Sequence, residues 1–234
     1  MMALADRISC ILPVYNGERF LAEALDSVLA QSLPPFELIV VDDGSTDGTA
    51  GVVAAYGKRV HCLRQENAGA AAARNAGLAL ARGELIAFMD ADDLWHQDKL
   101  ALQVARLRAR PDLQIVLAHL QNFWISELCE EAQAPAGQGL KTPRPGYVLQ
   151  ATLARRGVFD RVGRFDPALR MGEDTDWFAR AQDARIPLDV MPDVLVYRRF
   201  HRGNTTRDYA ARRAASLDVV HAALLRRRSA GRVG

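Results

Sequence analysis

The sequence has little cysteine and no long hydrophobic run. Its 234 residues include three cysteines, Cys10, Cys62 and Cys129, and no two of them show CxxC spacing. This argues against a disulfide framework or a structural zinc site and favours a reducing compartment. No apolar run approaches the ~20 residues of a membrane-spanning helix, and the first apolar run ends at Pro13, too early for a signal peptide. We therefore expect a cytoplasmic protein that reaches the inner face of a membrane, if at all, peripherally.

Neither sign of charge dominates the chain, whose formal net charge is +2. The charges are unevenly spread, because residues 1–93 hold 13 acidic and 7 basic side chains and residues 194–234 hold 10 arginines and 2 aspartates. The basic tail could contact phosphates, an anionic membrane or an acidic partner, or it could be a solvated helix. Residues 209–228 show an amphipathic pattern that could equally form a homodimer interface through Leu217, Val220 and Leu224.

Apolar runs alternate with helical patterns over the first 95 residues. Strands are predicted at residues 8–12, 36–41, 60–63 and 85–89. Helices are predicted at residues 18–31, from the capping residues 45–47 to residue 56, and at 69–82. This alternation is typical of an α/β fold, with a Rossmann-like, mostly parallel sheet flanked by helices. Without internal repeats or a strong linker, the chain reads as one domain.

The second half is less regular. We expect a helix at residues 98–110, a strand at 113–120, a mixture of helix and turn at 147–162, a helix at 174–183 and a strand at 190–200. Residues 127–146 are rich in Gly, Pro, Gln and Glu and predict a loop. Such a loop could close over a bound ligand and exclude water.

Polar clusters follow three of the predicted strands, at residues 13–16, 42–45 and 90–93. In parallel sheets ligands gather beyond the carboxyl ends of the strands. We therefore expect the three clusters to converge on one edge of the sheet and to form a site there.

The strongest signal is Asp90-Ala91-Asp92-Asp93, directly after an apolar strand. Mg²⁺ and Mn²⁺ prefer hard oxygen ligands and are often held by one or two carboxylates, with substrate phosphates completing the shell. The alternative is a polar turn that caps the next helix. We assign Asp92 to a metal and Asp93 to a helix cap.

Asp42 and Asp43 end the second strand, and Gly44 allows a tight turn there. A carboxylate at this place can accept a hydrogen bond from a nucleobase or from ribose. The alternative is a capping turn, and both interpretations can hold together, since residues 45–47 are of capping types.

Three further positions carry candidate chemistry. Arg74, on a helix that faces the cleft, could pair with a diphosphate or a base, or could lie on the helix surface. Asp174, beside Glu173 at a helix N-terminus, is kept ionised by the helix dipole and suits a general base, although acids there also cap helices. His201 is either a metal ligand, a diphosphate contact or a structural histidine.

Taken together, these segments resemble family 2 glycosyltransferases, the inverting group with the GT-A fold. The likeness covers residues 8–95 almost continuously and resumes over residues 157–205. It rests on segments that resemble the family's motifs, at residues 11–16, 40–47, 67–77, 88–95 and 162–177. Residues 96–146 show no family pattern. The resemblance implies a nucleotide-binding half at residues 1–95, an acceptor-side half at 96–205 and a basic C-terminal helix at 206–234.

The resemblance also implies a role for each site residue. The nucleobase would be lined by Pro13, Tyr15 and Asp43 (or Asp42). The ribose, diphosphate and metal would be met by Asp90, Arg74, Asp92 and His201, with Asp92 and His201 at the metal. Asp174 would be the catalytic base, with Glu173 beside it.

The implied activity is the transfer of one sugar, in glycan biosynthesis, from a nucleotide-diphosphate sugar to an acceptor hydroxyl. A UDP-sugar is the expected donor, Mg²⁺ or Mn²⁺ the cofactor, and a saccharide, lipid-linked sugar or peptide the acceptor; no nucleic acid partner is expected. The Gln-x-x-Arg-Trp motif of processive synthases is absent. A nucleotidyltransferase would need a basic, Gly-rich loop near the N-terminus, where only Gly17 and Arg19 occur. A non-catalytic sugar-nucleotide binder is the third alternative, against which the intact acids argue.

Overall fold

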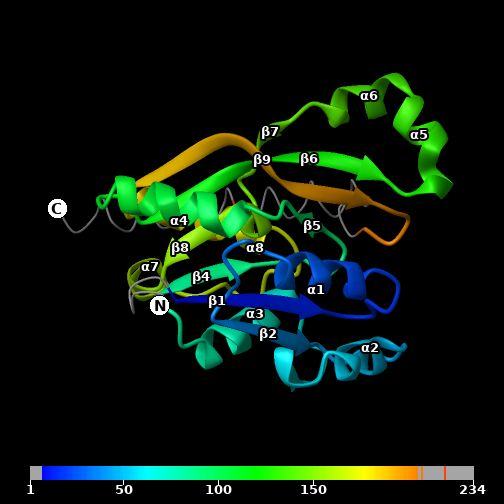
Figure 1. The fold of residues 1–234 in the computed structure, drawn as a ribbon, viewed down its shortest axis with the longest axis horizontal. Helices are drawn as coiled ribbons and strands as arrows, with labels where there is room; N and C mark the ends of the chain where they lie inside the picture. The colour runs from blue at the N-terminus through cyan, green and yellow to red at the C-terminus, as the bar shows by residue number, and fades with distance from the viewer. Residues whose placement is uncertain (1–6, 205–206, 208–218, 220–234) are drawn as a thin grey trace.

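The computed structural model describes residues 7–204, together with residues 207 and 219. In this part of the chain the strands form a nine-stranded sheet in the order β3-β2-β1-β4-β8-β6-β9-β5, with β7 paired to β6 (Figure 1). The strands are β1 Ile8–Val14, β2 Glu37–Asp42, β3 His61–Arg64, β4 Leu85–Phe88, β5 Leu94–Trp95, β6 Ile115–Trp124, β7 Arg144–Pro145, β8 Thr152–Arg155 and β9 Leu188–Phe200.

Helices flank this sheet. The α-helices are α1 Leu21–Leu29, α2 Thr49–Ala55, α3 Ala70–Leu80, α4 Lys99–Ala109, α5 Cys129–Gln133, α6 Pro135–Lys141, α7 Gly157–Val162 and α8 Glu173–Asp183. Short 3₁₀ turns lie at η2 Gly57–Arg59, η3 Ser126–Leu128 and η4 Leu149–Ala151. No helix in the described ranges is both long enough and apolar enough to cross a membrane.

The first half of the sheet is parallel, as the alternation of elements predicted. β1 pairs in parallel with β2 and β4, and β2 pairs in parallel with β3. The second half is mixed, because β8 runs antiparallel to both β4 and β6, while β6 and β9 run parallel as two long strands (Figure 1). The fold class is therefore confirmed as α/β with a mixed sheet.

The core lies on both faces of this sheet, and alternate residues of β1 point to the two faces. Cys10 and Leu12 pack with the apolar faces of α1 and α4, whereas Ile11 packs with α3, α7 and α8. The small residues of α3 let this helix approach β1 closely, since a Cβ added at Gly77 would lie 2.4 Å from Cγ2 of Ile11. This packing fixes α3, and the side chains it carries, against the carboxyl end of the sheet.

Two segments differ from the prediction. Residues 147–162 were expected to be a mixture of helix and turn. They do contain η4 and α7, but strand β8 lies between these two, and its four residues are too few to show a clear alternation. Residues 127–146 were expected to be a loop, but they form η3, α5, α6 and β7, with Pro135 at the first turn of α6, where its missing N–H costs nothing. The tail helix predicted at residues 209–228, with Leu217, Val220 and Leu224, lies outside the described residues, apart from the buried Val219.

Candidate functional site

A cavity of about 950 Å³ opens at the carboxyl ends of β1, β2 and β4. The three polar clusters that follow these strands meet there, as the sequence predicted, and α8 and the end of β9 contribute to the opposite wall. The predicted site residues that line the cavity are Pro13, Tyr15, Asp43, Arg74, Asp90, Asp92, Glu173, Asp174 and His201.

The structure separates the two neighbouring aspartates at the end of β2. Asp42 is buried and lies outside the cavity lining, and its Oδ1 accepts the Ser45 N–H at 2.8 Å. Asp42 therefore holds the turn that follows β2. Asp43 lines the cavity and accepts hydrogen bonds from Gln65 Nε2 at 2.7 Å and from the N–H groups of Ala68 and Gly69 at 2.9 and 2.8 Å. Asp43 thus fixes the loop that leads into α3.

Arg74 lies inside the protein and not on the surface of α3. Only 6% of it is exposed. Its guanidinium donates to Oδ1 of Asp90 at 2.9 Å and forms an ion pair with Glu173. Burial opposes the charge, but the carboxylates of Asp90 and Glu173 raise the pKa of Arg74. One arginine therefore connects α3, the end of β4 and the first turn of α8.

Asp92 and His201 face each other in the cavity, with Oδ2 of Asp92 2.9 Å from Nε2 of His201. Asn204, which the sequence analysis did not single out, holds both: its Nδ2 donates to Oδ2 of Asp92 at 3.1 Å, and its Oδ1 accepts the His201 N–H at 2.6 Å. The His201 ring also contacts the Phe20 ring, with centroids 4.8 Å apart. The histidine is thereby oriented toward the carboxylate.

The prediction that Asp93 caps a helix is wrong. Helix α4 begins after Asp98, and Asp93 is only 2% exposed. Its carboxylate accepts the Arg199 N–H and the Gln150 amide, each at 2.9 Å. Burial, together with the nearby charge of Asp92, raises the pKa of Asp93 well above its usual value. Asp93 therefore lies in the cavity lining with its carboxylate engaged, where it links β9 to η4.

Asp174 lies in the first turn of α8, which Gly172 introduces in a left-handed conformation with φ of 79°. Its Oδ1 accepts the Thr175 N–H at 2.7 Å. Burial, followed by the charge of Glu173, raises the pKa of Asp174, and Arg74 opposes this rise. The helix dipole was expected to keep this carboxylate ionised, and burial acts in the opposite direction. A raised pKa makes the ionised carboxylate a better proton acceptor.

The donor atoms at Asp92 and His201 fit a divalent cation that is shared with a substrate. Among the residues that the structure describes, no three His, Cys, Asp or Glu side chains are grouped so that they could hold a metal by themselves. A carboxylate and an imidazole from the protein, with phosphate oxygens and water as further ligands, match the incomplete protein shells that Mg²⁺ and Mn²⁺ accept. Residues 127–146, which were expected to close over the ligand, contribute no described residue to the cavity lining.

Comparison with known proteins agrees with this geometry. Residues 9–174 match the model of "Glycosyl transferase family 2". An uncharacterized glycosyltransferase of Rickettsia felis is 42% identical over 216 residues, which cover 83% of this chain and 34% of that protein. The chain thus spans about a third of that relative's length.

Two solved structures share the fold. S. aureus TarS 1–349 in complex with UDP-GlcNAc is 23% identical, with a TM-score of 0.71 over 86% of this chain and 61% of that one. The mannosyltransferase PcManGT of Pyrobaculum calidifontis in complex with GDP-Man and Mn²⁺ is also 23% identical, with a TM-score of 0.65 over 85% of this chain and 58% of that one. At this identity the likeness establishes the fold alone.

Proposed function

The chain belongs to glycosyl transferase family 2, and from that premise we propose that its cavity binds a UDP-sugar and transfers one sugar unit, with inversion, to an acceptor hydroxyl. The observation that carries this proposal is the meeting of the Asp92–His201 pair and Asp174 in one cavity. The solved neighbours support the donor class, since one holds UDP-GlcNAc and the other GDP-Man.

The nucleoside is assigned to the wall formed by Pro13, Tyr15 and Asp43. Tyr15 is 53% exposed, so one face of its ring is free to cover a base. Oδ2 of Asp43 accepts a hydrogen bond from the Gly69 N–H, and a carboxylate oxygen can accept a second from a base N–H. Asp90 meets the ribose with Oδ2, because its Oδ1 is bonded to Arg74.

Asp92 and His201 would hold Mg²⁺ or Mn²⁺. When bound, the ion supplies positive charge beside the diphosphate and stabilises the negative charge that develops on it as the glycosidic bond breaks. Arg74 contributes a different effect: its single positive charge offsets part of the negative charge of Asp90 and Glu173, and it thereby weakens their repulsion of a diphosphate in the same cavity.

Asp174 is the base. It accepts the proton of the acceptor hydroxyl as that oxygen forms a bond to the anomeric carbon, and the nucleoside diphosphate leaves with the electron pair of the broken bond. Glu173 is bound to Arg74, so Asp174 is the carboxylate of this pair that stays available. A saccharide, a lipid-linked sugar or a peptide could supply the hydroxyl.

The test is calorimetry with a panel of UDP-sugars, with and without Mn²⁺. Asp92→Asn is expected to remove the metal-dependent part of donor affinity and to abolish turnover, whereas Asp174→Asn is expected to bind donor normally and to lose turnover. Equal donor affinity with and without metal in the wild type would refute the metal assignment. Loss of donor binding in Asp174→Asn would refute the base assignment.

The released product and its stereochemistry complete the test. Release of UDP supports glycosyl transfer, and release of pyrophosphate would instead indicate a nucleotidyltransferase. NMR of the glycoside formed would show inversion or retention directly.

The membrane contact proposed for the arginine-rich tail predicts binding to anionic vesicles at low salt. Absence of this binding would refute the contact.

A further inference from the structure

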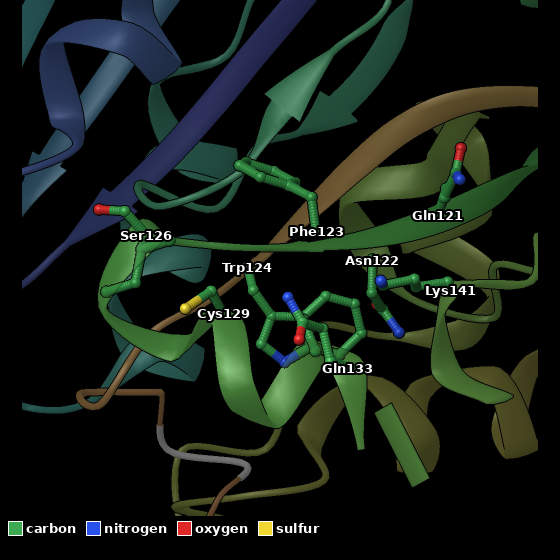
Figure 2. Close-up of a pocket in the computed structure, with 10 residues that line it drawn as sticks. Gln121, Asn122, Phe123, Trp124, Ser126, Cys129, Gln133 and Lys141 are labelled. Atoms are coloured by element: carbon green, nitrogen blue, oxygen red, sulfur yellow. The ribbon is translucent and has the colours of Figure 1, made fainter. Parts of the chain in front are cut away.

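A second pocket of about 420 Å³ lies between β6 and the helices α5 and α6 (Figure 2). Successive side chains of β6 point to opposite sides, so Asn122 and Trp124 face this pocket while Phe123 points away (Figure 2). Gln133 of α5 and Lys141 of α6 approach from the helices. The volume lies in the range of small-molecule sites, roughly 300–1,000 Å³.

The pocket contains a buried polar atom that lacks a partner. Asn122 is 3% exposed, and its Nδ2 donates to the Leu140 carbonyl at 2.8 Å. Within the described part of the chain, Oδ1 of the same amide has no hydrogen-bond partner. A buried acceptor left unpaired is costly, and it calls for a donor such as a hydroxyl.

The remaining lining matches an uncharged ligand with many hydroxyl groups. The amide of Gln133 offers both donors and an acceptor. The Trp124 ring gives an apolar surface; it stacks on Phe200 with centroids 4.9 Å apart. No described residue that lines the pocket is a carboxylate, which disfavours a cation. Lys141 is the charged member of the lining and lies over the Trp124 ring, with its Nζ 6.0 Å from the centroid, while the unpaired Oδ1 of Asn122 disfavours an anion.

Aromatic and apolar contacts connect this pocket to the large cavity. Phe200 is the last residue of β9. Its ring stacks on Trp124 of the small pocket, and the next residue, His201, lines the large cavity. Phe20 also lines the large cavity, and it packs against Ile125, which lines the small pocket. We propose that the small pocket binds a neutral sugar unit of a saccharide acceptor, one that lies outside the unit that reacts. This rests on the proposed transfer to an acceptor, and it narrows that acceptor to a glycan that extends from the large cavity.

Fluorescence titration of the intact protein with cellotriose, maltotriose and chitotriose tests this proposal. We expect at least one of them to change the tryptophan emission saturably, and Trp124→Phe to abolish the change. Gln133→Ala should weaken binding about tenfold, which corresponds to about 1.4 kcal/mol. Gln138→Ala is the matched control, because Gln138 is an exposed glutamine of α6 outside the pocket lining, and it should bind like the wild type.

The outcomes separate this proposal from the donor site. Titration with UDP in the same variants reports on the large cavity and should be unchanged, which also shows that the variants are folded. The pocket assignment is overturned if no trisaccharide binds, if Gln133→Ala binds as well as the wild type, or if inorganic phosphate competes with the sugar. Failure of UDP to bind the wild type would instead refute the donor assignment.

Discussion

The side chain of Lys99 offers a quantitative test of how the core behind the site is built. Lys99 is fully buried, with its Nζ bonded to Gln103 Oε1 at 2.8 Å and 4.0 Å from the centroid of the Trp95 ring. Burial lowers the pKa of Lys99 from 10.5 to about 7. Trp95 in turn donates to the Gln150 carbonyl, and the Gln150 side chain donates to Asp93 in the cavity lining.

This pKa sets a direction for stability against pH. Below pH 7 the amine is charged in both states, and the folded state bears the cost of burying it. Between pH 7 and 10.5 the folded state releases the proton while the unfolded state keeps it, so stability rises with pH. A pKa of about 7 in place of 10.5 corresponds to about 5 kcal/mol over the whole range. From pH 7 to pH 9 the gain is about 2 kcal/mol.

Lys99→Met should remove this dependence. At pH 6 the variant should unfold at higher urea concentration than the wild type, because the gain of up to about 5 kcal/mol exceeds the roughly 1 kcal/mol lost with the Gln103 hydrogen bond. The difference should shrink by about 2 kcal/mol between pH 7 and pH 9. Lys58→Met, at an exposed lysine, is the control and should follow the wild type at each pH. A difference between Lys99→Met and the wild type that is equal at pH 7 and pH 9 would refute the reasoning.

Three further predictions concern the packing and chemistry of the site. Gly77→Ala should lower the free energy of unfolding in urea by about 1–3 kcal/mol, because the new Cβ would overlap Ile11. Gly139→Ala is the control and should stabilise the protein, because nothing lies within 4 Å of a Cβ added there. Equal effects of the two substitutions would contradict the packing argument. The acid limb of the pH profile of kcat/KM should lie above the usual aspartate range, since the pKa of Asp174 is raised. Arg74→Gln should move this limb to still higher pH, because Arg74 opposes the rise in the pKa of Asp174. A limb that does not move would contradict the assignment of Asp174. Asn204→Ala should weaken Mn²⁺-dependent donor binding roughly 10–100-fold in calorimetry and leave metal-free binding unchanged; a loss in both conditions would instead indicate a structural role.

The sequence predicted the parallel half well because each signal there is local. An apolar strand, a turn cluster and a helix follow one another within each unit, and the rule that ligands lie beyond strand ends then placed Asp43 and Asp92 in one cavity. The choice between Asp42 and Asp43 depended on side-chain direction at the end of β2, which alternation alone does not fix once the strand has ended. The domain division at residues 95 and 205 stays a prediction.

The second half was predicted less well because its contacts are distant in sequence. Strand β8 is inserted between β4 and β6, and its register partners lie 35–39 positions away in β6 and 66–70 positions away in β4. Asn204 and Arg199 acquire their roles only when β9 returns to the edge of the cavity, more than 100 positions after the Asp92 and Asp93 groups that they contact. Residues 127–146 have a loop-like composition, yet they form helices that pack on the side of β6 that carries Asn122 and Trp124, where Asn122 donates to the Leu140 carbonyl of α6.

Arg74 shows why the two halves have to be considered together. Seen along the sequence it is a basic residue in an alanine-rich helix, and a surface position and a phosphate contact were equally plausible. In the fold it is buried between Asp90, just after β4, and Glu173, in the first turn of α8. Because breaking a buried ion pair on one side leaves a charge uncompensated, the positions of β4 and α8 are energetically coupled through this one side chain. A substitution next to Asp90 should therefore alter the pKa of Asp174. The pH profile of Arg74→Gln measures this coupling.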